Sequence, residues 1–425
     1  MWAAIKSISS LLLSFGLLLL GSGMTGTLLG LRARHEGFPT EITGIIMAGY
    51  FLGLLLGGLF AVRVVAAVGH IRAFAAFASI MSVAVLAHVL IIDPTSWFML
   101  RIIAGFCMAG MVMVVESWIN ERATNQTRSR FLSLYMMTNY LGAGTGQFIM
   151  LIGDPAQFQL FVIASMVYSF ALVPILLTRS KAPKPSSPQR TKFRQLFAIS
   201  PVGVFGTICA GVATSSFNGM GAVFAREAGL SVSEVSFFMV TAIFWGMILQ
   251  FPLGRLSDRF DRRTVLVISA LATAGAAYGI IWSIGQPRPA IFIASAIFGR
   301  FCFSIYPLST SQVNDLADPD RLVQVAAGML ISYGIGASIG PILAALSMAW
   351  AGSGGFFVFV MAVNGTLAVF TIIRIAQRDR GDKAKARFMP LGGAAVTSKQ
   401  RLTPLPSLKR PVAKPRSSHS AMQTP

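Results

Sequence analysis

The chain alternates long apolar runs with short polar segments. A run of about 20 residues is the length that a helix needs to cross the hydrocarbon core of a bilayer. A helix is the expected form of each span because it satisfies its own backbone hydrogen bonds in lipid. One set of runs lies near residues 8–31, 42–62, 73–92, 96–119, 131–152 and 157–177. A second set lies near residues 201–224, 234–253, 264–284, 289–312, 324–349 and 355–373. The pattern predicts an all-α integral membrane protein with twelve transmembrane helices.

Two polar segments divide the chain. Residues 179–200 contain proline and several lysines and arginines between the two sets of runs. Residues 377–425 are rich in proline, serine and basic residues, and they lack the apolar surface needed to fold alone. We therefore expect an N-terminal six-helix bundle over 1–178, a cytoplasmic basic linker over 179–200, a C-terminal six-helix bundle over 201–376, and a disordered basic cytoplasmic tail over 377–425.

The two sets of runs are related to each other. A shift of 194 positions, the distance from Gly105 to Gly299, superimposes identical residues in two runs and the loop between them. The matched pairs are Gly105 with Gly299, Ser117 with Ser311, Asn120 with Asn314, Gly142 with Gly336, and Gly146 with Gly340. A constant offset of this kind predicts two pseudo-symmetric bundles, an architecture in which transporters place the substrate site where the halves meet.

Composition agrees with a membrane protein. Charged residues make up 12% of the chain and hydrophobic residues 54%, whereas a soluble domain carries about 25% charged residues. The cysteines Cys107, Cys209 and Cys302 all lie inside apolar runs, so they predict no disulfide framework. Residues 1–23 resemble a signal peptide, but the apolar run continues to Leu31 without a cleavage site, which favours a retained first span.

The distribution of charge predicts the orientation. A formal charge of +20 is compatible with binding to nucleic acid. The basic residues lie between the spans and in the tail, however, so we expect no nucleic-acid partner. With the N-terminus inside, nearly all loop lysines and arginines face the cytoplasm. The outward segments hold only Arg32, Arg34, Arg226 and Arg288. The positive-inside rule therefore predicts that both termini are cytoplasmic.

The loop near residue 258 carries a recognisable motif. It reads Gly-Arg-Leu-Ser-Asp-Arg-Phe-Asp-Arg-Arg over 254–263 and resembles the loop signature of the major facilitator superfamily. The resemblance implies a cytoplasmic gate made by Gly254, Asp258, Arg259, Arg262 and Arg263. In the matching first-half loop, Val62 stands where the signature has aspartate. A charge network around Arg63 would therefore need Glu116 or Glu121 as its acid.

Two arginines lie inside predicted spans. Arg101 begins an Arg-Ile-Ile-Ala-Gly element that resembles a second superfamily motif, and Arg300 lies deeper in its own span. A charge at such a depth costs several kcal/mol unless it snorkels, pairs or meets water. Arg101 is thus a candidate for lining a cavity, with snorkelling at the outer rim as the alternative. Together the two arginines favour a substrate with an anionic or polar group.

Apart from Glu234, at the first position of its run, Glu116 is the one carboxylate predicted within a span. A desolvated glutamate can have its pKa raised toward neutrality, which suits proton coupling. The alternative role is a gate salt bridge to Arg63 or Arg130, since Glu116 lies near the cytoplasmic end. The following Glu-Ser-Trp-Ile-Asn string, residues 116–120, resembles a group of poorly characterised bacterial permeases of the superfamily.

Further polar and aromatic residues within the spans are candidates for substrate contacts. They are Asn139, Asn218, Trp245, Tyr306 and Tyr333. Glycines spaced by four residues recur at 49, 53 and 57, at 142 and 146, and at 336 and 340. Such spacing lets helices approach closely, and we expect these glycines to lie between the two halves.

The function expected from these features is secondary active transport of a small, anionic or amphipathic solute by alternating access. A proton or solute gradient would drive it, and the resemblance places the chain in a plasma membrane (in a bacterium, the inner membrane). We expect a monomer, with no cofactor, metal or enzymatic activity. A drug–proton antiporter is an alternative, although Gly146-Gln147 stands where that pattern has glycine and proline. A second alternative is a transporter-shaped receptor that uses its basic tail.

Overall fold

A computed structural model describes residues 2–123, 128–177, 193–318 and 321–377. Every regular element within these ranges is helical, which confirms the all-α prediction. The first half contains α1 (Trp2–His35), α2 (Thr40–Val68), α3 (His70–Leu90), α4 (Pro94–Arg122), α5 (Arg128–Ile149), η1 (Met150–Ile152), α6 (Gln159–Phe170) and α7 (Leu172–Leu176). The second contains α8 (Phe193–Ile199), α9 (Pro201–Glu227), α10 (Val232–Arg259), α11 (Arg262–Ser283), α12 (Arg288–Cys302), α13 (Ile305–Asn314), α14 (Leu322–Ala351) and α15 (Gly355–Ala376).

Most of the predicted spans are confirmed as helices that can cross a bilayer. In the described ranges, ten spans are long and apolar enough, or eleven if the two arms of α10 are counted as one. The arms of α10 meet at a bend of 41°, and Pro252, which opens the second arm, cannot donate the backbone hydrogen bond that would continue the helix. The remaining predicted span is α5, which is helical over 22 residues but more polar than the others.

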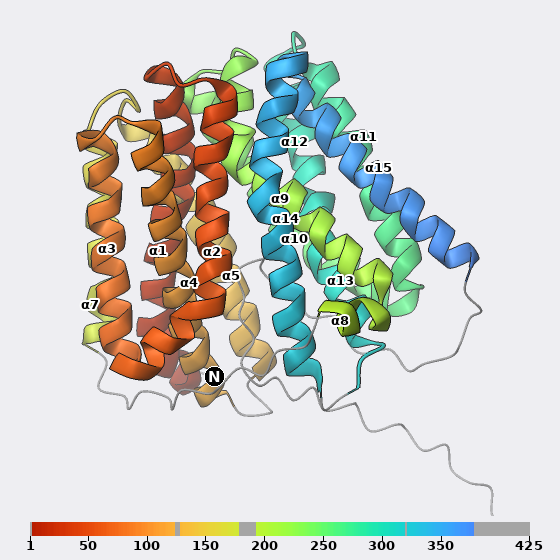
Figure 1. The fold of residues 1–425 in the computed structure, drawn as a ribbon, viewed down its shortest axis with the longest axis horizontal. Coiled ribbons are helices and arrows are strands. Elements are labelled where there is room, and N and C mark those ends of the chain that lie inside the picture. Colours follow the sequence, from red (N-terminus) through yellow and green to blue (C-terminus); the bar gives the residue numbers. More distant parts are fainter. Residues whose placement is uncertain (1, 124–127, 178–192, 319–320, 378–425) are drawn as a thin grey trace, which may run out of the picture.

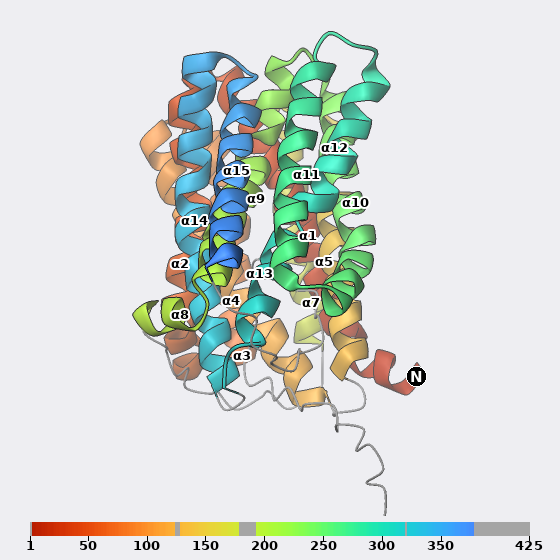
Figure 2. The same cartoon turned by 90° about the vertical axis from the view of Figure 1, so that its right-hand side faces the viewer.

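The two halves lie side by side (Figure 1). The N-terminus and the loops after α2 and α10 lie at one end of the bundle, the lower end in Figures 1 and 2, which we call the basic face. The α1–α2 turn, residues 36–39, and the α9–α10 turn, residues 228–231, lie at the opposite end, which we call the turn face.

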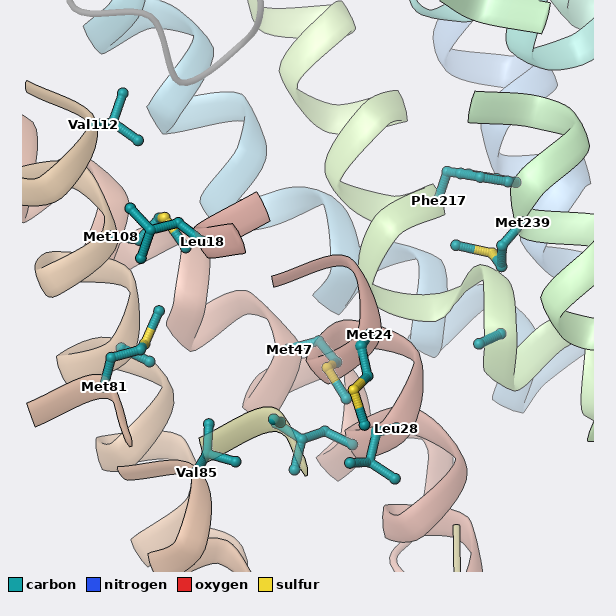
Figure 3. Packing of buried hydrophobic residues seen from close by; sticks show 14 of the residues in the cluster. Leu18, Met24, Leu28, Met47, Met81, Val85, Met108, Val112, Phe217 and Met239 are labelled. Atoms are coloured by element: carbon teal, nitrogen blue, oxygen red, sulfur yellow. The ribbon is translucent and has the colours of Figure 1, made fainter. Parts of the chain in front are cut away.

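Each half has a core of apolar side chains. In the first half, Leu18 of α1, Met81 of α3 and Met108 of α4 are buried in one cluster (Figure 3). In the second half, Phe217 of α9 and Met239 of α10 lie close together. The glycine pairs that reveal the repeat make matching contacts in the two halves. Gly105 packs on the backbone of α2 at Tyr50, and Gly299 packs on the backbone of α10 at Ala242.

The glycine registers correct one prediction. We expected them to lie between the halves, but they pack within each half. Gly53 faces the backbone of α4, Gly146 faces the backbone of α1, and Gly336 faces the backbone of α9. Four-residue spacing predicts that two backbones approach closely, but it does not say which helix is the partner.

The halves contact each other on the side of the turn face. Arg34 and Thr40 both lie against Glu227 of α9, at 3.8 and 3.2 Å. Gly44 of α2 lies against the backbone of Pro341 in α14. Nearby, Phe148 of α5 and Phe237 of α10 stack edge to face, and Met47 of α2 packs on Gly219 of α9. Met47 shares its pocket with Met24 and Leu28 of α1 (Figure 3).

The predicted linker ends in a short helix. Residues 193–199 form α8, whose Leu196 is buried against Val204 and Met329 of the second half. Ser200 then caps α9, because its hydroxyl accepts a hydrogen bond from the Gly203 amide at 3.2 Å. The rest of the linker, and the tail from residue 378, lie outside the described residues.

Candidate functional site

Arg101 lies inside the first half. Its side chain is 5% exposed, and its guanidinium carbon is 4.3 Å from the centroid of the Tyr50 ring on α2. Its Nε has no hydrogen-bond partner. Tyr168 of α6 and His88 of α3 are within electrostatic range. Within the described part of the chain, no carboxylate pairs with this guanidinium, so its charge is held by aromatic faces and dipoles alone.

The groups around Arg101 are fixed by their own hydrogen bonds. The Tyr50 hydroxyl is 3.1 Å from the Ser22 hydroxyl, and the Tyr168 hydroxyl is 3.3 Å from the Thr25 hydroxyl, so both rings are tied to α1. His88 Nδ1 lies 2.6 Å from the carbonyl oxygen of Ala84, and the His88 ring stacks edge to face on Trp97. This arrangement holds the guanidinium in place and leaves donors available for a negatively charged guest.

A second group of side chains lies where the halves meet. Tyr306 of α13 and Tyr333 of α14 stack edge to face, with 5.1 Å between ring centroids. Both share a buried apolar cluster with Phe51 of α2 in the other half, and Tyr50 packs against that cluster. Tyr140 of α5 lies in hydrogen-bonding range of Gln250 on α10. The structure thus brings the predicted Tyr306 and Tyr333 together. Both belong to the second half, and they share their cluster with Phe51 of the first half.

Glu116 has a phenol as a partner. The Tyr135 hydroxyl of α5 donates a hydrogen bond of 2.7 Å to Glu116 Oε1, and the Glu116 side chain is buried. Glu116 also lies within electrostatic range of Tyr306 across the junction. Arg63 is exposed and stacks over Phe60, 5.3 Å from its centroid. Among the described residues Arg63 forms no ion pair, so the structure does not join it to Glu116 or to the exposed Glu121.

The loop motif of the second half forms a buried charge network. Arg262 is 2% exposed and donates to Asp315 Oδ2 at 2.6 Å, to the Ser257 hydroxyl at 2.9 Å and to Asp258 Oδ1 at 3.0 Å. The Ser257 hydroxyl donates in turn to the Gly254 carbonyl at 2.8 Å. These contacts tie α10, α11 and α13 together at the basic face. Arg259 is exposed, and Arg263 is held through its backbone amide by Asp261.

The other predicted site residues are dispersed. Arg300 is half-buried over Phe301, and its buried Nε has no partner. Asn139 is half-buried on α5. Asn218 is exposed although most of α9 is buried, and its backbone lies near Gly26 of α1. Trp245 is 46% exposed on α10. The structure does not gather these four residues around Arg101.

The sequence model of one large transporter family matches residues 11–204 and, separately, residues 203–416, once for each half. The chain belongs to the Major Facilitator Superfamily. It is 27% identical over 358 residues to the uncharacterized MFS-type transporter YcaD of Escherichia fergusonii, which covers 83% of this chain and 92% of that protein. Membership of this superfamily, and the names of the relatives, place the protein among membrane transporters.

Solved structures agree on the superfamily fold. The nucleoside transporter NupG aligns over 87% of this chain and 98% of its own, with a TM-score of 0.73 and 13% identity. The D-xylose-proton symporter aligns over 86% of this chain and 97% of its own, with a TM-score of 0.69 and 15% identity. At such low identity the likeness concerns the fold alone.

The sequence patterns did not identify several side chains that contact or surround the predicted charged residues. Tyr50, Tyr135, Tyr168 and His88 surround the two predicted charges, yet none was a candidate. All four are rings with a polar end within an apolar span. A buried tyrosine usually has a hydrogen-bond partner for its hydroxyl, so such a ring in a span is a signal that could have identified them. Within the described residues, no group of three or more histidine, cysteine or acidic side chains could hold a metal ion.

Proposed function

We propose that the protein is a secondary active transporter of a small solute that carries a negative charge, and that Arg101 binds the charged group. The observation that carries this proposal is the buried guanidinium, which has no carboxylate partner in the described residues and has its Nε unpaired. A charge in the middle of a bilayer costs at least about 3 kcal/mol when nothing compensates for it. An anionic guest offsets this cost through charge-assisted hydrogen bonds.

The way the halves meet supports a mechanism of alternating access. The contacts at Glu227, Gly44 and Phe148 join the two halves on the turn-face side. Under the positive-inside prediction this side faces outward, so the structure supports a state closed to the outside. We propose that the halves rock about the junction at Tyr306 and Tyr333, and that both termini lie in the cytoplasm of the plasma membrane.

Glu116 is the proposed coupling group. A carboxylic acid that is buried against a phenol inside a span can take up and release a proton as the halves move, because its access to water changes. Its position near Tyr306 makes it sensitive to movement of the other half. A proton-coupled carrier would therefore lose the pH dependence of uptake in the Glu116→Gln variant, while a carrier driven by another gradient would keep it.

The test of the proposal is solute flux into proteoliposomes. We expect a panel of radiolabelled organic anions to include one that wild-type protein accumulates under an imposed gradient. Arg101→Gln should abolish that flux, and Arg101→Lys should retain part of it, because lysine keeps the charge but loses the planar fork. Arg72→Gln is the matched control, since Arg72 is exposed at the basic face. Flux that is unaffected by Arg101→Gln would refute the assigned role.

The same experiment separates transport from a receptor function. A receptor of transporter shape binds its ligand without moving it across the membrane, so the vesicles would bind the anion without accumulating it. Deleting residues 377–425, the basic tail, sharpens the comparison. A transporter retains full flux after the deletion, whereas a receptor that signals through the tail loses its response.

A further inference from the structure

Aromatic side chains extend from Arg101 toward the second half. The row consists of Tyr50, Phe51, Tyr333 and Tyr306. Tyr50 carries the guanidinium of Arg101 on its ring, and its centroid is 5.4 Å from that of Phe51 in an edge-to-face contact. Phe51 belongs to the same buried cluster as Tyr333 and Tyr306. The aromatic row therefore begins inside the first half and ends in α13 and α14 of the second.

The row has a positive end and a negative end. Arg101 lies at its start, and Glu116 lies within electrostatic range of Tyr306 at its other end. Both charged residues belong to α4 and are separated by 15 positions, which is about 22 Å along a helix. An anion lying on the row is attracted by Arg101, and it is repelled at the other end when Glu116 is ionised. Its acid group is therefore oriented toward Arg101 and the turn face.

A neutral donor lies beside the row. Gln250 is 1% exposed, and its side-chain nitrogen has no hydrogen-bond partner. Tyr140, in hydrogen-bonding range of the same side chain, is within electrostatic range of Tyr333. A guest that supplies an acceptor to this buried amide donor would offset the cost of leaving it unpaired. A carbonyl or hydroxyl oxygen on the uncharged part of the solute meets this requirement.

We propose that the solute is an aromatic anion whose carboxylate or other acid group pairs with Arg101 and whose ring packs on Phe51 and Tyr333. Aromatic rings favour edge-to-face and offset contacts with one another over contact with saturated groups. Tyr50 and Ser22, which are partly exposed, form the side from which such a molecule reaches the guanidinium. This inference rests on the proposed function, because it assigns the rest of the molecule whose charge Arg101 binds.

Matched pairs of acids test the role of the ring. Benzoate and 2-naphthoate are compared with cyclohexanecarboxylate and decahydronaphthalene-2-carboxylate, and benzyl alcohol serves as the uncharged ring compound. The readout is the dissociation constant from thermal stabilisation of the purified full chain in detergent. We expect each ring acid to bind about 3- to 10-fold more tightly than its saturated counterpart. Tyr333→Leu should reduce this ratio toward one, whereas Tyr278→Leu, at an exposed tyrosine of α11, should leave it unchanged.

The outcomes distinguish the two proposals. Equal affinity for both members of each pair, with binding lost in Arg101→Gln, overturns the ring assignment and leaves the anion assignment standing. Binding of benzyl alcohol as tightly as benzoate, unaffected by Arg101→Gln, overturns the anion assignment instead. Failure of every ring compound to stabilise the protein overturns the ring assignment as well. A ratio that survives Tyr333→Leu shows that the preference arises elsewhere and contradicts the role of the aromatic row.

Discussion

Arg262 donates from Nε to Asp315 Oδ2 at 2.6 Å, although the two residues are 53 positions apart. The same guanidinium donates to Asp258 at 3.0 Å. Arg262 thus pairs with two carboxylates, and the Asp315 side chain is itself only 11% exposed. The three residues fasten α10, α11 and α13 to one another at the basic face.

Removing this guanidinium should destabilise the second half. In Arg262→Met both carboxylates lose a counterion, and breaking a buried pair on one side typically costs about 3 kcal/mol or more. We expect a clear fall in the midpoint of thermal unfolding in detergent. Arg263→Met is the control, because Arg263 bonds Asp261 through its backbone amide. Equal midpoints for the two variants would contradict the importance of the network.

Glu227 joins the halves at the turn face, and weakening it should favour opening there. Glu227→Gln loses the attraction to Arg34, at 3.8 Å. A partly exposed pair contributes about 0.5–1 kcal/mol, so the population open at the turn face should rise about two- to fivefold. The measurement is the rate at which Met47→Cys, buried between the halves, reacts with a maleimide in the Glu227→Gln background.

The chain offers a matched control for this experiment. Glu36→Gln removes an ion pair whose glutamate is about as exposed as Glu227, but Glu36 pairs with Arg32 within its own half at 2.6 Å. The reaction rate of Met47→Cys should not change in that background. A similar increase for both variants would show that charge at the turn face acts nonspecifically and that Glu227 has no special role in closure.

Close packing of α2 on α4 positions Tyr50 beneath Arg101. A Cβ added at Gly53 would lie 2.9 Å from the carbonyl carbon of Ile102, inside the backbone of α4. Gly53→Ala should therefore cost about 1–3 kcal/mol of stability and weaken anion binding by displacing Tyr50. Gly58→Ala meets no atom within 4 Å and should be neutral or slightly stabilising, since alanine favours helix. Thermal unfolding and anion titration of both variants give the comparison.

Asp93 gives a prediction about pH. Its carboxylate accepts a hydrogen bond of 2.7 Å from the Ser96 amide and caps α4. This backbone hydrogen bond lowers the pKa of Asp93 from its usual 3.8. A carboxyl with a lowered pKa in the folded state stabilises the fold above its unfolded pKa, and this stabilisation is lost as the pH falls through the folded pKa.

Asp93→Ala should therefore unfold at a lower temperature than wild type near neutral pH, and the gap should narrow in acid. Asp93→Asn keeps a capping oxygen without the charge, so its deficit should be smaller and should vary less with pH. Unfolding midpoints of the three proteins across an acid titration provide the test. If the difference in unfolding midpoint between Asp93→Ala and wild type stayed constant down to strong acid, the charge of the Asp93 carboxylate would not contribute to the cap.

The architecture was predictable from the sequence because lipid imposes it on the composition. Twelve apolar runs and a constant offset such as that from Gly105 to Gly299 identify two related six-helix halves without any knowledge of packing. The depth of Arg101 and Glu116 was predictable in the same way, since a charge inside an apolar run is rare. These inferences depend only on the positions of residues along the sequence.

Partners across helices were not predictable. The loop motif identifies Arg262, but Asp315 becomes its partner only through the packing of α13. The sequence left a gate arginine as one possible partner of Glu116, but it gave no sign of the hydrogen bond that Tyr135 on the next helix donates to this carboxylate. Helix rotation and tilt decide such pairings, and a single sequence does not specify either one. The aromatic row required the same knowledge, because Phe51 and Tyr333 belong to different halves and share one buried cluster only in the folded protein.

We expect the halves to rock about their junction and to expose the proposed anion site to one side at a time. Spin labels at His35→Cys and Ser233→Cys report the turn face, since both positions are exposed, and labels at Arg63→Cys and Arg259→Cys report the basic face. Double electron–electron resonance on both pairs in lipid nanodiscs, across a pH series and with benzoate, measures the two distances. We expect two populations in each pair, with the turn-face distance increasing under the conditions in which the basic-face distance decreases. A single unchanged distance at both faces, or distances that increase together, would contradict it.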